Sequence, residues 1–223
     1  MYVFTTFTES GYRKLASFIR RVRGSVAVPI PGSLCEDARR LGPDSLRKRG
    51  VPASFARVWR PVLGLLASTN TPRVECYLGE VDFEEARYRA VDAASLIIRA
   101  DVYGVADLEE WVRVFRRGAQ PVREVGEFTV VDDYVKAYAT LKANPGAPYT
   151  ALEEVVPTPF DLLALLALGE LSRDLFGRLV EFSLRYFNDY LLRSVNLTRA
   201  YRRLVRDREY MDFLVSHNIP VFE

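Results

Sequence analysis

Residues 127–138 read Glu-Phe-Thr-Val-Val-Asp-Asp-Tyr-Val-Lys-Ala-Tyr, and this stretch sets the expected fold. Its first part, Glu127–Val131, is rich in β-branched and aromatic residues, which favour a strand. The two aspartates that follow are typical of a helix start, because a carboxylate there accepts hydrogen bonds from free backbone N–H groups. The segment therefore predicts a strand that leads directly into a helix.

Glycine, proline and β-branched residues cluster on both sides of this segment. A second strand is predicted near Leu152–Val156, after a turn at Asn144–Pro148. Because helical patterns dominate before residue 118 and after residue 157, we expect residues 118–157 to form a small α/β subdomain.

The remaining sequence predicts helices. Thr8 precedes apolar residues at the helical period, and Ser33 and Glu36 have the spacing of a capping box. Pro159 stands at the tolerated first-turn position of a later helix, and a last helix is expected over about Leu197–Val215.

The predicted fold class is therefore mainly α. A helical bundle-like body would be formed by residues 1–117 and residues 158–223, with the α/β subdomain of residues 118–157 between these two parts.

Composition describes a globular chain without a membrane span. Of 223 residues, 49% are hydrophobic and 27% are charged, so the chain can bury a core. No apolar run approaches the roughly 20 residues of a membrane helix, and the opening residues MYVFTTFTES lack the features of a signal peptide. The sequence predicts a cytoplasmic protein with no membrane contact.

Arginine dominates the basic residues. Lysine occurs only four times, so 27 of the 31 basic residues are arginine, and glutamine occurs once. Scarce amides and abundant ion-pairing residues favour a thermophilic source. Base composition is the alternative explanation of the arginine excess. Since the net charge is only +2, an anion-binding surface must come from local clustering of arginines.

The clearest cluster lies on the last predicted helix. Four arginines follow one another at i, i+3, i+4 and i+7, so they form one stripe that suits backbone phosphates of nucleic acid. They are Arg199, Arg202, Arg203 and Arg206. A second basic cluster at the end of the first predicted helix contains Arg20, Arg21 and Arg23. An ion-paired surface is the alternative for both.

Aromatic residues near such arginines would favour single strands, because bases stack on exposed rings. The candidates are Tyr134, Tyr138, Tyr186, Tyr190 and Tyr201. Aromatic residues at helical spacing are also typical of a buried core, which is the alternative.

Known signatures of catalytic sites are absent from the sequence. The chain has one histidine, His217, and two cysteines, Cys35 and Cys76, which we interpret as buried thiols. Asp132 and Asp133 are the best carboxylate pair for a divalent ion, but helix capping explains them better. The sequence predicts no catalytic residue, no metal and no cofactor in this chain.

Four segments follow one another in an order that a known family also shows. They are Tyr2–Phe4, Ala38–Arg40, Glu84–Arg89 and Phe128–Lys136. They resemble the N-terminal region of the archaeal and eukaryotic DNA primase large subunit, and the last is similar to that family's F-x-V-x-x-x-D-Y-L-K stretch. The family's C-terminal iron–sulfur domain, with its four cysteine ligands, has no counterpart after residue 195.

This resemblance implies a non-catalytic, regulatory subunit of a DNA primase in DNA replication. Such a subunit binds the catalytic small subunit as a heterodimer and contacts the DNA template and RNA primer, while nucleotidyl transfer occurs in the small subunit. The strand-to-helix segment would form the interface, because apolar and tyrosine side chains make strong contacts. Its candidate residues are Phe128, Val130, Val131, Tyr134 and Tyr138.

Two alternatives stay open. The chain could be an unrelated thermophilic helical protein that binds nucleic acid or an anionic protein partner. An enzyme that uses Asp132 or Asp133 is the third reading.

Overall fold

The chain folds into two compact units. The computed structural model describes residues 1–44, 46, 51–67, 73–116 and 120–223. Unit 1 comprises Met1–Phe83, Pro121–Val155 and Phe222–Glu223, and unit 2 comprises Glu84–Gln120 and Val156–Val221. The chain therefore alternates between the units: it leaves unit 1 after Phe83, returns at Pro121, builds the rest of unit 2 from Val156, and ends in unit 1.

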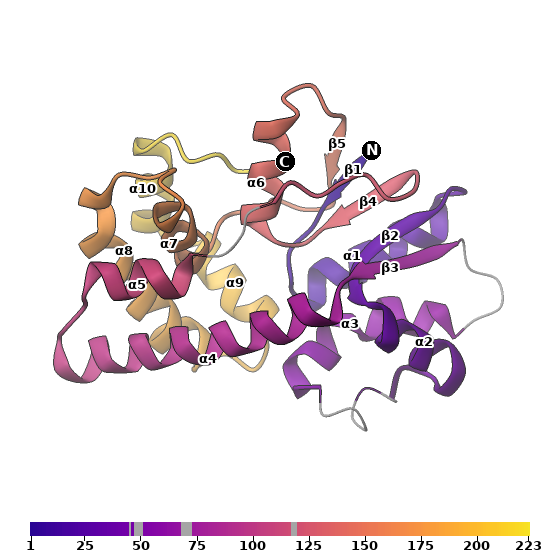
Figure 1. Ribbon diagram of the computed structural model, residues 1–223, viewed down its shortest axis with the longest axis horizontal. Coiled ribbons are helices and arrows are strands. Elements are labelled where there is room, and N and C mark those ends of the chain that lie inside the picture. Colours follow the sequence, from indigo (N-terminus) through magenta and orange to yellow (C-terminus); the bar gives the residue numbers. More distant parts are fainter. Residues whose placement is uncertain (45, 47–50, 68–72, 117–119) are drawn as a thin grey trace. The chain divides into compact units, whose positions relative to one another are not determined.

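Unit 1 is built around a five-stranded parallel sheet. Its strands are β1 (Tyr2–Phe4), β2 (Val26–Pro31), β3 (Val74–Leu78), β4 (Phe128–Val131) and β5 (Tyr149–Ala151). They lie in the order β3-β2-β4-β1-β5, and each neighbouring pair runs parallel. Strand β4 is therefore at the centre of the sheet (Figure 1).

This sheet corrects the expected fold class. The molecule is a helix-rich mixed α/β protein, so the prediction of a mainly α, bundle-like body is wrong. Strands β4 and β5 belong to the same sheet as the N-terminal strands, since Tyr2 is in register with Thr129 and Val26 with Phe128. The expected boundary between residues 117 and 118 lies outside the described residues.

The N-terminal strands β1 and β2 are buried on both faces. Every residue of β1 and β2 is buried, so these strands are short apolar runs without the two-residue alternation of a half-exposed strand. Strand β2 also contains Pro29 and Pro31, which donate no backbone hydrogen bond, and its register with β3 shifts after Val28.

Helices and the C-terminus cover the two faces of this sheet. The helices are α1 (Glu9–Arg21), α2 (Gly32–Leu41), α3 (Ala53–Leu66) and α6 (Tyr134–Ala143). Helix α1 packs on α3, and its Phe18 ring lies 5.3 Å from the Phe128 ring of β4. On the opposite face, the Phe222 ring lies 5.3 Å from that of Phe4 and 5.1 Å from that of Tyr134. Because successive side chains of a strand point to opposite faces of the sheet, the two aromatic clusters lie on different faces.

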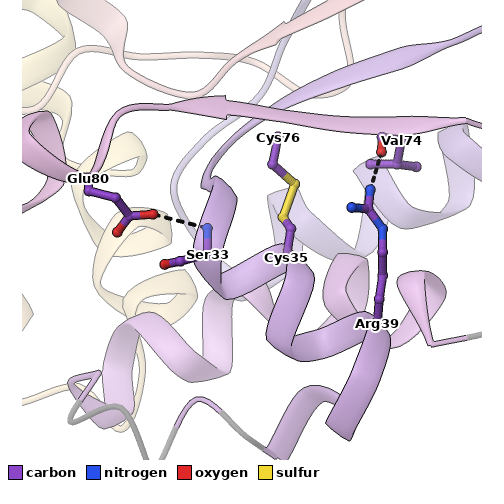
Figure 2. The surroundings of a disulfide bond; sticks show 6 residues. All are labelled: Ser33, Cys35, Arg39, Val74, Cys76 and Glu80. Carbon is purple, nitrogen blue, oxygen red and sulfur yellow. Dashed lines mark hydrogen bonds between the residues drawn. A yellow bond between two sulfur atoms is a disulfide. The ribbon is translucent and has the colours of Figure 1, made fainter.

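Of the two helix caps predicted for α1 and α2, one is confirmed and one is wrong. Thr8 caps α1 as predicted, with its hydroxyl accepting a backbone hydrogen bond at 3.0 Å. The capping box of Ser33 and Glu36 is wrong, because α2 has no side-chain cap. Instead, the Ser33 N–H donates to the carboxylate of Glu80 at 3.0 Å (Figure 2). Glu80 follows β3, so no local pattern predicts this contact.

A disulfide joins Cys35 of α2 to Cys76 of β3 (Figure 2). The prediction of two buried thiols is therefore wrong. The cysteines are 41 residues apart in the sequence, but β2 leads into α2 and pairs with β3, which brings them together. The bond fastens an edge strand to the helix that packs beside it.

Unit 2 is helical. Its helices are α4 (Glu80–Tyr103, of which the first four residues belong to unit 1), α5 (Leu108–Phe115), α7 (Pro159–Ala167), α8 (Phe176–Arg185), α9 (Leu197–Val205) and α10 (Arg208–Ser216), with a 3-10 turn η2 (Arg173–Leu175) and a π-helical turn η3 (Tyr186–Leu191). Pro159 opens α7 as predicted, after the capping residue Thr158. Within the described chain, none of the helices combines the length and apolar character needed to cross a membrane.

The predicted last helix is in fact two helices. Helix α9 ends at Val205, and Asp207 caps α10 by accepting a hydrogen bond from the Tyr210 N–H at 3.2 Å. The arginines at 206 and 208 continue the pattern of a single helix, which conceals this break from sequence analysis. Arg206 consequently lies at the C-terminal cap of α9.

Candidate nucleic-acid interface

Four arginines lie along one exposed face of α9. They are Arg199, Arg202, Arg203 and Arg206, here called the arginine stripe, and all four are exposed. The opposite face of α9 is anchored in unit 2, because Leu204 is buried and the Tyr201 hydroxyl bonds to the backbone of Val156. The helix therefore holds the stripe at a fixed surface position.

No member of the stripe pairs with an acidic side chain in the described part of the chain. Arg203 donates from Nη1 to the Asp189 carbonyl oxygen at 2.8 Å, and its guanidinium lies 5.5 Å from the centre of the Tyr190 ring. Within the residues that the structure describes, Arg199, Arg202 and Arg206 form no ion pair and no side-chain hydrogen bond. The alternative of an ion-paired face therefore does not describe these three residues.

The acidic residues that follow the stripe in sequence form ion pairs with arginines of α8. Arg185 pairs with Asp207 at 3.2 Å and with Glu209 at 2.6 Å, and Arg178 pairs with Glu209 and with Glu181. Hydrogen bonds from Arg185 and Arg178 lower the pKa of Glu209. Burial raises the pKa of Asp207, but hydrogen bonds, among them one from Arg185, more than offset this and keep the value below normal. As far as the described residues go, the positive charge of the stripe is therefore not neutralised by an ion pair.

The second predicted cluster lies in unit 1, at the C-terminal end of α1. Arg20, Arg21 and Arg23 are exposed, and Arg21 Nε donates to the Ser17 carbonyl oxygen at 3.2 Å. Basic residues in the last turn stabilise a helix through its dipole. The helix itself thus explains most of this cluster, whereas the arginine stripe needs another explanation.

The residues expected to dock a partner lie largely inside unit 1. Val130, Val131 and Tyr134 are buried, and Phe128 and Tyr138 are partly exposed. The chain's own helices and C-terminus cover this segment, because β4 is the central strand. A docking surface for another subunit would have to be made by other residues.

Four of the five candidate tyrosines are buried or hydrogen-bonded within the chain. Tyr134 and Tyr186 are buried in the cores of units 1 and 2. Tyr190 and Tyr201 are partly exposed, but the Tyr190 hydroxyl donates to Asp207 at 2.9 Å and the Tyr201 hydroxyl bonds to Val156. The geometry therefore favours contact with phosphates over stacking with bases.

Asp132 and Asp133 have different roles at the carboxyl end of β4. Asp133 caps α6 by accepting a hydrogen bond from the Lys136 N–H at 3.1 Å, as capping predicts. Asp132 accepts a hydrogen bond from the Tyr12 hydroxyl at 2.6 Å. Burial raises the pKa of Asp132 to about 6, against the opposing effect of the Tyr12 hydrogen bond. Among the described residues, no group of three or more potential ligands could hold a metal ion.

The ionisation of Asp132 should make the stability of unit 1 depend on pH. Its pKa is about 6 in the folded chain and 3.8 ordinarily, so the folded state holds this proton more tightly. The resulting stabilisation is complete below about pH 4 and is lost as the pH rises through about 6. Between about pH 4 and about pH 6 we expect the free energy of unfolding of the wild type to fall by about 2 kcal/mol relative to that of the Asp132→Asn variant.

Chemical denaturation at several pH values measures this difference. Asparagine retains an oxygen that can accept the Tyr12 hydrogen bond, so the variant isolates the effect of the charge. Asp212→Asn is the matched control at an exposed carboxylate. A difference between wild type and Asp132→Asn that stays constant with pH would contradict the raised pKa.

A cavity of about 320 Å³ lies beside the disulfide, between α2 and β3. Three of its charged residues bind within the chain: Arg39 Nη2 donates to the Val74 carbonyl oxygen at 2.6 Å (Figure 2), and Arg73 pairs with Glu75 at 2.8 Å. These groups are engaged, so we do not assign a ligand to this cavity.

The chain matches no protein-family model, no curated protein and no solved structure. The resemblance to the primase large subunit consequently stays a prediction. The arrangement of the chain's own residues has to supply the functional hypothesis.

Proposed function

We propose that this protein binds nucleic acid through its backbone phosphates, with the arginine stripe of α9 as the contact surface and no catalytic site in this chain. The observation that supports the proposal is the exposure of Arg199, Arg202 and Arg206 without an acidic partner among the described residues. Arg178 and Arg185 of α8, in contrast, are ion-paired. Clustered, unneutralised guanidinium groups are the electrostatic footprint of phosphate binding.

The length of the stripe fits the spacing of phosphates. From Arg199 to Arg206 the helix rises by about 10 Å, and successive phosphates of one strand lie about 3.4 Å apart along a duplex axis. The stripe can therefore contact about three successive phosphates. Arg199 also stands in the first turn of α9, where the helix dipole disfavours a positive charge, so helix stability gives no reason for it.

A DNA primase is one setting in which this binding would serve, as the resemblance implies. Contacts with template and primer fit a surface that binds phosphates without reading bases. Co-expression with a primase small subunit tests this setting. A stable heterodimer would support the role, and separate elution of the two chains would contradict it.

The proposal places the protein in the cytoplasm of a thermophile, where nucleic acid is accessible. A disulfide is compatible with that location, because intracellular proteins of hyperthermophiles are often disulfide-rich. The arginine-based ion pairs of α8 and α10 fit the same source.

Fluorescence polarisation with labelled single-stranded and double-stranded DNA and RNA tests the binding. With three to four phosphate contacts, affinity should fall roughly 100-fold between about 50 and about 200 mM salt. Poly-glutamate is the competitor that represents an anionic protein partner. Absence of binding at the lower salt concentration, or competition by poly-glutamate as strong as by nucleic acid, would contradict the proposal.

A further inference from the structure

Helix α4 has two apolar faces within unit 2. Leu96, Ile97 and Ala100 are buried and attach the helix to the unit. Tyr88, Val91, Ile98 and Val102 are each between 52% and 71% exposed. At about 100° per residue the two sets lie on roughly opposite sides of the helix, so a second apolar face is open to solvent.

The exposed face has the spacing of a coiled-coil seam. Residues 88, 91, 95, 98, 102 and 105 alternate steps of three and four, and only Ser95 among them is polar. Val105 stands just after Gly104, which follows the end of α4 with φ of 66°, and it is exposed as well. Single exposed apolar residues are ordinary on a surface, but a continuous seam indicates an interaction site. We call these six residues the α4 seam.

We propose that the α4 seam binds the same seam of a second copy of this chain, with the two helices antiparallel. A two-fold interface requires one surface to be complementary to itself. In antiparallel pairing, Val91 meets the partner's Val102 and Ser95 meets the partner's Ile98, while Tyr88 lies opposite the end of the partner's helix, where Val105 follows. The symmetry repeats the layers of Val91 with Val102 and of Ser95 with Ile98, so each of these layers contains at least one apolar residue.

Charges beside the seam are complementary in this register. Asp92 and Arg99 lie on the same side of the seam. Antiparallel pairing brings Asp92 next to the partner's Arg99, and Arg99 next to the partner's Asp92. Arg99 already contacts Glu110 of its own chain, so the partner's Asp92 would add a second acid to the same guanidinium.

Antiparallel pairing also suits the helix better than parallel pairing. Parallel helices would place Ser95 against the partner's Ser95 in the seam, whereas the antiparallel register covers each serine with an isoleucine. The macrodipoles of antiparallel helices oppose each other, which is electrostatically favourable. Since the fold already orders the helix, pairing loses less conformational entropy than association of free peptides.

Sedimentation equilibrium of the intact protein, from about 1 to about 100 μM, measures the dimer. Wild type should sediment as a dimer at the higher concentrations, and the variant Val91→Glu with Ile98→Glu should sediment as a monomer. The matched control is Val195→Glu with Val215→Glu, which changes two residues of unit 2 that are 71% and 76% exposed outside the seam. A monomeric wild type, or a seam variant that dimerises like the control, overturns the proposal.

Cysteine cross-linking tests the orientation. The double variant Val91→Cys with Val102→Cys should form an intermolecular disulfide under mild oxidation, because these positions face each other across the antiparallel seam. The single variant Val91→Cys should not, since residue 91 of one chain lies far from residue 91 of the other. Cross-linking of the single variant would indicate parallel helices and overturn the antiparallel arrangement.

Discussion

Loss of the Cys35–Cys76 disulfide should lower the free energy of unfolding of unit 1 by about 4 kcal/mol. The bond closes a loop between residues 41 apart in sequence, and chain-entropy reasoning assigns about this cost to releasing such a loop in the unfolded state. The effect should be confined to unit 1, because α2 and β3 both belong to it. Cys35→Ala with Cys76→Ala and reduction of the wild type should give the same result.

Two tryptophans allow the units to be followed separately. Trp59 is buried in unit 1 and Trp111 is buried in unit 2, and the chain has no other tryptophan. In a Trp111→Phe background, fluorescence reports the unfolding of unit 1. A reductant should lower the midpoint of this transition in the protein that has the disulfide, and should leave the midpoint of the double alanine variant unchanged. An unchanged midpoint in reduced wild type would contradict the expected stabilisation.

Replacing Arg199, Arg202 and Arg206 by glutamine should weaken nucleic-acid binding about 100-fold near physiological salt. Each lost phosphate contact removes the release of about one counterion, and three such losses correspond to about 3 kcal/mol at this salt concentration. Glutamine keeps the length and helical propensity of the side chain, so the fold should be unaffected. Because the stripe contacts phosphates and not bases, the loss should be similar for different sequences.

The control for this variant removes the same charge elsewhere. Arg40, Arg113 and Arg173 are exposed and pair with Asp37, Glu110 and Glu109. Their replacement by glutamine should change affinity by only a few-fold, since these charges are neutralised within the chain. Equal losses in the two triple variants would show that net charge, and not the stripe, drives binding.

Some local features of the fold were predictable from the sequence, although the capping box of Ser33 and Glu36 was not among them. The cap at Thr8, the proline at the start of α7 and the strand-to-helix step at residues 128–134 depend on neighbouring residues and occur where expected. The arginine stripe depends only on helical spacing, and the break after Arg206 leaves it on one face.

Features that join distant segments were not predictable in the same way. The order of the sheet depends on pairing Tyr2 with Thr129, and the disulfide depends on β2 lying next to β3. Tyr12 was missed as the partner of Asp132, because 120 residues separate them. Recognising β1 would have placed both near the carboxyl edge of the sheet, where parallel sheets gather polar residues.

Whether each arginine is ion-paired also depends on tertiary structure. The sequence offers acids beside the stripe at Asp207 and Glu209, and nothing local shows that both bind arginines of α8. Likewise, residues 88–105 have a seam spacing in the sequence, but only the structure shows that this face is exposed while the opposite face is buried.

The salt dependence of nucleic-acid affinity, compared between wild type and the Arg199, Arg202 and Arg206 triple glutamine variant, tests the central claim most directly. If these residues contact phosphates, the slope of log affinity against log salt should be less steep in the variant by about three units, or about 0.9 for each arginine. Equal slopes in the two proteins would contradict the claim, because they would mean that the stripe neutralises no phosphate.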